Sequence, residues 1–144
     1  MSRAYKIVLL IALYIAQGLP FGFFTGALPI LLRKAGYSLT AISALSLLYL
    51  PWALKFLWAP LVDRIGRRKY WLLSLQLASV LAAAVLARTE ITESLVVVLA
   101  AAFVFNLIAA TQDIVTDGLA VRMLDREERG IGNGIQVGAY RFGM

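Results

Sequence analysis

Long uncharged runs alternate with short charged segments along the chain. Residues 7–32, 35–54, 71–87 and 94–112 contain no Asp, Glu, Lys or Arg. A helix needs about 17 to 25 mainly apolar residues to cross roughly 30 Å of hydrocarbon, so each run is long enough for one transmembrane helix. The regular alternation of apolar and polar residues that is typical of membrane β-strands is missing. The pattern therefore predicts an all-α membrane protein, a helical bundle with spans near residues 7–32, 38–62, 70–87 and 94–120.

A fifth apolar stretch, residues 131–144, is shorter than the others. At about 1.5 Å per residue it cannot cross the bilayer. We therefore expect four complete spans plus a truncated fifth, in a fragment of a longer chain whose missing part supplies packing partners. Gly130, Gly134 and Gly138 recur every four residues, and this spacing predicts a face for close helix packing.

The first predicted span contains the stretch QGLPFGFFTGALP, residues 17–29. Glycine and proline are tolerated in a membrane helix where neighbouring groups satisfy the freed backbone. Two interpretations stay open: a kinked helix used for packing, and a helix that bends beside a cavity during transport.

Composition supports a membrane protein and narrows the available chemistry. The chain is 61% hydrophobic with 15% charged residues, and its mean hydropathy is +0.81. Cys and His are both absent, which excludes disulfides and every thiolate or imidazole ligand, nucleophile or base. We expect no cofactor, no metal site and no catalytic residue. The net charge of +6 would indicate nucleic acid in a soluble protein, but here the cations lie mainly between the apolar runs, so the expected partner is the lipid bilayer and not nucleic acid.

The distribution of positive charge predicts the orientation. The two sides of the bundle carry different numbers of cations, and cytoplasmic loops are the ones enriched in Lys and Arg. One side holds Arg3, Lys6, Arg64, Arg67, Arg68, Lys69, Arg122, Arg126 and Arg129; the other holds Arg33, Lys34 and Arg88. The N-terminus is therefore expected in the cytoplasm, with the loop 88–93 outside.

The charged loop between the second and third spans, APLVDRIGRRKYW, carries a specific spacing. It resembles the inner loop signature of the major facilitator superfamily, G-x-x-x-D-R-x-G-R-R/K, with Ala59 in place of the leading glycine. The stretches GLP, KFLWAPLVDR, TQDIVTD, ERG and GAYRFGM narrow the resemblance to the AmpG-type muropeptide permeases and to related carriers of siderophores or acetyl-coenzyme A.

This resemblance implies a fold, a location and an activity. The chain would be part of the N-terminal six-helix bundle in a twelve-helix transporter of the bacterial inner membrane, inactive as this fragment alone. The activity would be proton-coupled import of an anionic solute such as a muropeptide, with siderophores or acetyl-coenzyme A as alternatives. The gate of the family implies roles for Asp63, Arg64 and Arg67, with Asp117 as the partner of Arg67.

Four polar residues are predicted to lie near the middle of the membrane. Counted from the inner edge of each helix at about 1.5 Å per residue, they fall at a depth of roughly 12 to 15 Å; they are Gln17, Lys55, Asp113 and Arg141. A charge at that depth costs about 2.5 to 3.5 kcal/mol on insertion scales, so such groups face a cavity or one another. We expect Asp113 to meet Lys55, Arg141 or both.

The hypothesis is that Lys55 and Arg141 receive the carboxylates of the substrate, while Asp113 holds these cations when the site is empty and Gln17 adds a hydrogen bond. The alternative is a fixed buried triad that only joins helices. Asp113 is also the first candidate for carrying the proton, unless the missing part of the chain holds that group.

Two other classes of protein compete with a transporter. Asp113 and Asp117, four residues apart, could share Mg²⁺ in an intramembrane transferase, but no further acidic residue is expected at that depth and the nearby cations would repel a metal. A short helper or assembly protein is the other alternative. We expect a transporter and not an enzyme.

Overall fold

The first transmembrane helix is continuous but irregular. The computed structural model describes residues 2–88 and 94–144. In it, α1 (Arg3–Gly22) passes through a π-helical turn, η1 (Phe23–Ala27), into α2 (Leu28–Lys34). The Ser2 side chain caps α1 by accepting a hydrogen bond from the backbone N–H of Tyr5. Pro20 lies inside α1, where it has no N–H to donate, and the π-helical turn begins three residues later.

The second transmembrane helix alternates between α and 3-10 geometry. It runs through α3 (Leu39–Ser43), η2 (Ala44–Tyr49), α4 (Leu50–Leu54) and η3 (Lys55–Leu57), and α5 (Ala59–Arg64) follows it. Pro51 cannot donate a backbone hydrogen bond to the carbonyl of Leu48 three residues before it. The side-chain amide of Asn106 donates to that carbonyl instead. Asn106 lies on α7 (Leu95–Met123), so α7 supplies the hydrogen-bond donor that Pro51 lacks.

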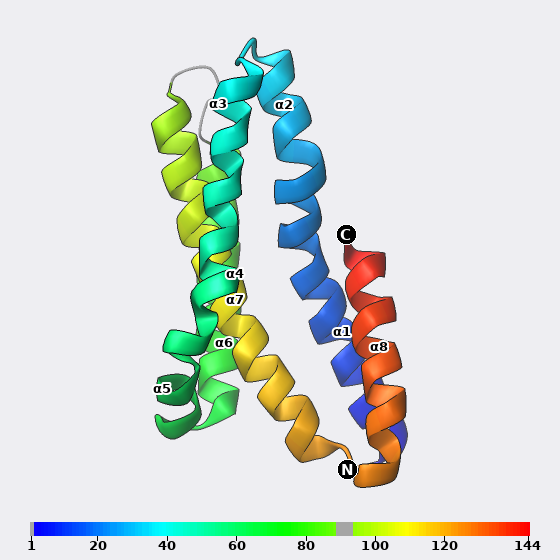
Figure 1. The fold of residues 1–144 in the computed structure, drawn as a ribbon. Coiled ribbons are helices and arrows are strands. Elements are labelled where there is room, and N and C mark those ends of the chain that lie inside the picture. The colour runs from blue at the N-terminus through cyan, green and yellow to red at the C-terminus, as the bar shows by residue number, and fades with distance from the viewer. Residues whose placement is uncertain (1, 89–93) are drawn as a thin grey trace.

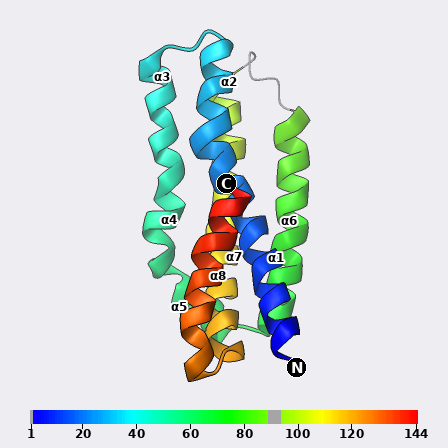
Figure 2. The same cartoon turned by 90° about the vertical axis from the view of Figure 1, so that its right-hand side faces the viewer.

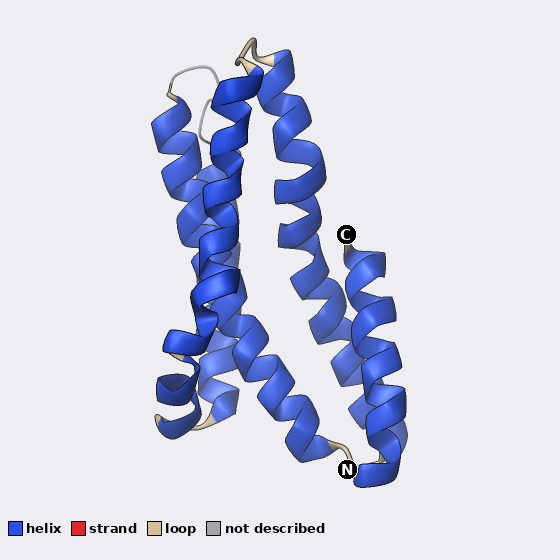
Figure 3. Ribbon diagram, in the orientation of Figure 1, coloured by secondary structure: helices blue, strands red, loops and turns tan. Residues whose placement is uncertain are grey.

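The described residues after Arg64 form three further α-helices and one short 3-10 turn. They are α6 (Arg68–Arg88), α7 (Leu95–Met123), η4 (Arg126–Glu128) and α8 (Arg129–Gly143). Within residues 2–88 and 94–144, four helical segments are long and apolar enough to cross a membrane: Arg3–Lys34, Leu39–Leu57, Arg68–Arg88 and Leu95–Met123. The residues with described structure include no β-strand (Figure 3). The predicted all-α membrane fold is confirmed. Of the predicted outer loop, Arg88 ends α6 and residues 89–93 lie outside the described residues.

The bundle is built around α7. Helix α6 runs along one side of α7, while α4 and α5 contact it from another, and α1 contacts both α7 and α8 (Figures 1 and 2). The apolar core farthest from the N-terminus joins Phe24, Leu28 and Leu32 of the first helix to side chains of η2 and α7. These contacts fix the upper half of the first helix against α7.

Helix α8 lies against α1 through glycine. A Cβ atom added to Gly18 would overlap the backbone carbonyl of Tyr140, and one added to Gly143 would overlap the carbonyl of Ile15. The two backbones therefore approach too closely for a side chain at either position. The predicted face of Gly130, Gly134 and Gly138 does not make this contact, since no described atom lies within 4 Å of a Cβ built on any of the three.

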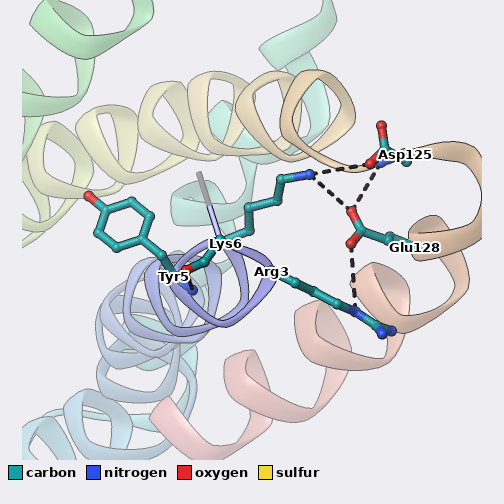
Figure 4. Close-up of polar contacts among 6 residues, drawn as sticks. Arg3, Tyr5, Lys6, Asp125 and Glu128 are labelled. Carbon is teal, nitrogen blue, oxygen red and sulfur yellow. Dashed lines mark hydrogen bonds and ion pairs between the residues drawn. The ribbon is translucent and has the colours of Figure 1, made fainter.

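One end of the bundle gathers the N-terminus, the turn after α5 and the turn between α7 and α8 (Figure 1). We call it the basic end, because it holds the larger set of cations named above. There Lys6 Nζ contacts Asp125 Oδ2 at 3.4 Å and Glu128 Oε2 at 3.2 Å, and Arg3 Nε lies 3.6 Å from Glu128 Oε1 (Figure 4). The Asp125–Glu128 capping box holds this turn, so the start of α1 is tied to the start of α8.

Candidate substrate site and gate

The central charged contact joins the second transmembrane helix to α7. Lys55, the first residue of η3, forms an ion pair with Asp113 of α7. The Asp113 side chain is only 8% exposed and that of Lys55 is 33% exposed, so the carboxylate is buried while the ammonium group is partly accessible. Lys55 Nζ also lies 5.4 Å from the ring centroid of Trp52, a cation–π contact. The pair satisfies the charge of Asp113 inside an apolar bundle.

Neighbouring groups from two helices orient Trp52. Its indole N–H donates to Asn106 Oδ1 at 2.6 Å, and Asn106 is itself held by the carbonyl of Leu48. The ring of Phe21 meets Trp52 edge-on with centroids 6.0 Å apart, and it meets the ring of Tyr140 at 5.8 Å. An aromatic group thus bridges α1, α4 and α8 beside the ion pair.

A cavity of about 690 Å³, which we call the charged cavity, opens next to this pair. Its lining residues are Trp52, Asp113, Gln136, Val137, Tyr140, Arg141 and Met144. Arg141 is exposed, and within residues 2–88 and 94–144 it forms no ion pair. Two cations, Lys55 and Arg141, therefore accompany one carboxylate. The surplus positive charge is available to an anion.

Gln17 lies on a different cavity. Its Nε2 donates to Thr116 Oγ1 at 2.6 Å, and its side chain is buried. It lines a largely apolar cavity of about 490 Å³ between α1, α6 and α7, together with Gln112 and Ser79. The structure thus pairs Lys55 with Asp113, places Asp113 and Arg141 on the charged cavity, and places Gln17 next to Thr116. A substrate contact for Gln17 stays a prediction.

The second carboxylate of α7 has neutral partners. Asp117 Oδ1 accepts a hydrogen bond from the Tyr14 hydroxyl at 2.9 Å and from Gln136 Nε2 at 3.1 Å. It lines a third cavity, of about 320 Å³, which extends along α7 and α8 to Leu124 and Arg129 at the basic end. We call this the inner cavity. Asp117 thus contacts both α1 and α8.

In the signature loop, Arg68 contacts both Asp63 and α7. Arg68 Nη2 donates to Asp63 Oδ1 at 2.5 Å, and Arg68 Nη1 donates to the carbonyl of Val115 on α7 at 3.4 Å. The guanidinium group also fills the space beside Gly118, where a Cβ atom would overlap it. Gly66 turns the chain with a φ of 73°, a conformation that favours glycine.

Arg64 and Arg67 are exposed, and the described residues contain no ion pair between Arg67 and Asp117. The gating roles of Asp63, Arg64, Arg67 and Asp117 stay predictions. The structure adds Arg68 as the residue that connects the loop to α7.

Several of these residues were missed at the sequence level. They are Tyr14, Trp52, Asn106, Gln136 and Tyr140. For Asn106 and Gln136 a signal existed, because an amide inside an apolar run needs a hydrogen-bond partner. The aromatic residues carried no such signal, since tyrosine and tryptophan are common near membrane interfaces without any role in binding.

The two carboxylates of α7 do not share a partner. Asp113 pairs with Lys55 and Asp117 binds Tyr14 and Gln136. Across the part of the chain that the structure describes, no group of three or more Asp and Glu side chains is arranged to hold a metal ion.

The chain is similar to one family model and to several known proteins. The family model of acetyl-coenzyme A transporter 1 matches residues 6–95. An anhydromuropeptide permease of Escherichia coli (strain K12) is 37% identical over 141 residues, which cover 94% of this chain and 29% of the permease. An uncharacterized protein of Haemophilus influenzae is 36% identical over 131 residues, covering 88% of this chain and 31% of that protein.

A putative transporter AmpG 4 of Rickettsia felis is 27% identical over 150 residues, covering 99% of this chain and 36% of the transporter. The chain thus spans about a third of the length of these relatives. No solved structure matches it.

Proposed function

The chain belongs to the acetyl-coenzyme A transporter 1 family, and from this premise we propose that it is part of a secondary active transporter that imports an anionic solute. The predicted resemblance to the AmpG-type permeases of the major facilitator superfamily is confirmed. The chain is a multi-pass membrane protein of a transporter family and not an enzyme.

The charged cavity carries this proposal. Lys55 is held by Asp113, which lines the charged cavity, and Arg141 lines this cavity without an ion pair among the described residues. An anionic solute can bind Arg141 first through charge-assisted hydrogen bonds. A second carboxylate of the solute can then compete with Asp113 for Lys55, so that binding releases Asp113 from its partner.

An anhydromuropeptide is the substrate that we propose. A sugar ring with peptide carboxylates combines an apolar ring face with negative charge, and the charged cavity offers Trp52 and Tyr140 beside Arg141. The similarity to the Escherichia coli permease, which extends over 94% of this chain, supports this choice. The match to the family model of acetyl-coenzyme A transporter 1 makes acetyl-coenzyme A the second candidate.

We further propose that transport is coupled to protons and that the basic end faces the cytoplasm of a bacterium, with the protein in the inner membrane. The excess of Lys and Arg at that end supports this orientation. The remaining helices of the transporter would come from a C-terminal part of the same protein, and the present chain alone would be inactive.

Uptake of labelled anhydromuropeptide by the full-length protein tests the proposal. We expect Arg141→Met to raise the KM by about 10- to 100-fold, because a charged hydrogen bond to the substrate is lost. Lys55→Met should also reduce uptake. Arg126→Met is the matched control, since Arg126 is exposed at the basic end. Normal uptake and normal protein level in both Lys55→Met and Arg141→Met would refute the binding role. Uptake of labelled acetyl-coenzyme A, but not of the muropeptide, would favour the second candidate.

A further inference from the structure

Asp113 and Asp117 lie one turn apart on α7 but have opposite kinds of partner. Asp113 is neutralised by the cation of Lys55. Asp117 is bound by two neutral donors, the Tyr14 hydroxyl and the Gln136 amide, and both donate to its Oδ1 atom. No hydrogen bond from the described residues reaches Oδ2 of Asp117. A proton on Oδ2 would leave both existing hydrogen bonds intact.

From this geometry we propose that Asp117, and not Asp113, is the proton-binding group of the transporter. The inference rests on the proposed function, because it assigns the coupling step of that transport. Asp117 lines the inner cavity, which reaches Leu124 and Arg129 at the basic end. A proton held on Oδ2 can therefore leave through this cavity without passing the Lys55–Asp113 pair.

Charged and titratable groups surround Asp117 from each helix that packs against it. Tyr14 on α1 donates to it, and Arg129 at the start of α8 lines the same cavity. Asp113, on its own helix, lies four residues away and therefore on the same face. Lys55 of η3 reaches Asp113, while Arg68 at the start of α6 contacts α7 beside Gly118. These cations have other contacts or lie at the ends of the cavity, and none forms an ion pair with Asp117 among the described residues.

The arrangement couples substrate to proton through Asp113. When a substrate carboxylate takes Lys55, the charge of Asp113 is no longer neutralised. A second negative charge one turn away then favours uptake of a proton by Asp117. The carboxylate becomes a carboxylic acid, with the proton on Oδ2, and returns to the carboxylate when the proton passes into the inner cavity. One proton moves with each substrate in this step, and no covalent bond to the substrate is formed.

Reconstitution of the full-length protein with labelled anhydromuropeptide separates coupling from binding. We expect Asp117→Asn to reduce accumulation driven by an imposed pH gradient by about tenfold or more. Exchange of labelled for unlabelled muropeptide at equal pH should continue, because exchange needs no net proton movement. Glu127→Gln, at an exposed residue of the basic end, is the matched control and should leave both activities unchanged.

Tyr14→Phe gives a second, graded readout. It removes one donor to the charged form of Asp117, so the pH profile of gradient-driven transport should move to higher pH by about one unit. Infrared difference spectra of the purified protein give a readout that does not depend on transport. A carboxylic acid band that appears on acidification should be lost in Asp117→Asn and retained in Glu127→Gln.

Two results would overturn the assignment: gradient-driven accumulation that survives in Asp117→Asn, or loss of exchange together with accumulation at a normal protein level. A titrating band that persists in Asp117→Asn would also overturn it. A parent protein that neither accumulates nor exchanges the muropeptide would instead refute the proposed function, and the infrared experiment would still decide whether Asp117 binds the proton.

Discussion

At the scale of single residues, the ion pair between Lys55 and Asp113 has the largest energetic consequences. Removing one partner of a buried pair costs roughly 3 to 5 kcal/mol, because the other charge stays buried without compensation. Here the Lys55 side chain is one-third exposed, so water recovers part of that cost. The pair therefore contributes to stability and to the charge balance of the cavity, and the two effects can be separated by mutation.

Lys55→Met should destabilise the full-length protein by about 2 kcal/mol, a value discounted for the exposure of the lysine. The double variant Lys55→Met with Asp113→Asn should recover most of the stability but not the uptake, because no charge remains buried and the cation for the substrate is still missing. Thermal unfolding in detergent measures the first effect and uptake measures the second. Lys34→Met, at an exposed residue far from the cavity, is the control. Equal stability of the single and double variants would contradict the expected pairing energy.

At the scale of helices, contact between α1 and α8 depends on backbone atoms more than on side chains. Gly18 and Gly143 face carbonyl groups of the partner helix at a distance that leaves no room for Cβ. Backbone atoms cannot move aside as a flexible side chain can. An added methyl group must therefore push the two helices apart.

Gly18→Ala should destabilise the protein by about 1 to 3 kcal/mol for this reason. Gly134→Ala is the matched control on α8, because a Cβ at Gly134 has no described neighbour within 4 Å. Alanine favours helix over glycine by up to about 1 kcal/mol, so the control should be neutral or slightly stabilising. Thermal unfolding of both variants measures the difference. A Gly18→Ala protein as stable as its parent would show that α1 and α8 are not in close contact.

The sequence predicted the fold class and the contact between Lys55 and Asp113, but not most of the residues that line the charged cavity. Uncharged runs have a length that only a membrane helix explains, and a charge inside such a run must find a partner. This reasoning led to Lys55 and Asp113. It did not identify Arg68 as the partner of Asp63, because neighbouring arginines of one loop have the same chemistry and only the loop geometry decides which of them reaches the carboxylate. Nor could it place Gln17, since depth along a helix says nothing about which side of α7 it faces.

At the scale of the whole molecule, the charge asymmetry between the two ends has a consequence for orientation. The basic end holds the N-terminus and the turns after α5 and α7, while the opposite end holds the turn between α2 and α3 (Figure 1). Cytoplasmic loops carry the excess of Lys and Arg in membrane proteins. The turn between α2 and α3 should then lie outside the cytoplasm.

Single cysteines test this orientation, since the chain has none of its own. In the full-length protein without other cysteines, Leu39→Cys should react with a membrane-impermeant maleimide in intact cells stripped of their outer membrane. Glu127→Cys should react only after the inner membrane is permeabilised. Both positions are exposed, so each serves as the control for the other. The reverse pattern would place the basic end outside.

The π-helical turn at Phe23–Ala27 changes the direction in which the side chains of the first transmembrane helix point before and after it. A π turn closes over one residue more than an α turn, and one residue corresponds to about 100° of rotation. The half before the turn presents Gly18 to α8, and the half after it presents Leu28 and Leu32 to the upper core. If the same residues formed an uninterrupted α-helix, the half after the turn would be rotated by about 100° and would face away from its neighbour. Deleting one residue of the turn should restore α geometry and keep both faces in place. A single helix thus serves two partners that an ideal helix could not face at once.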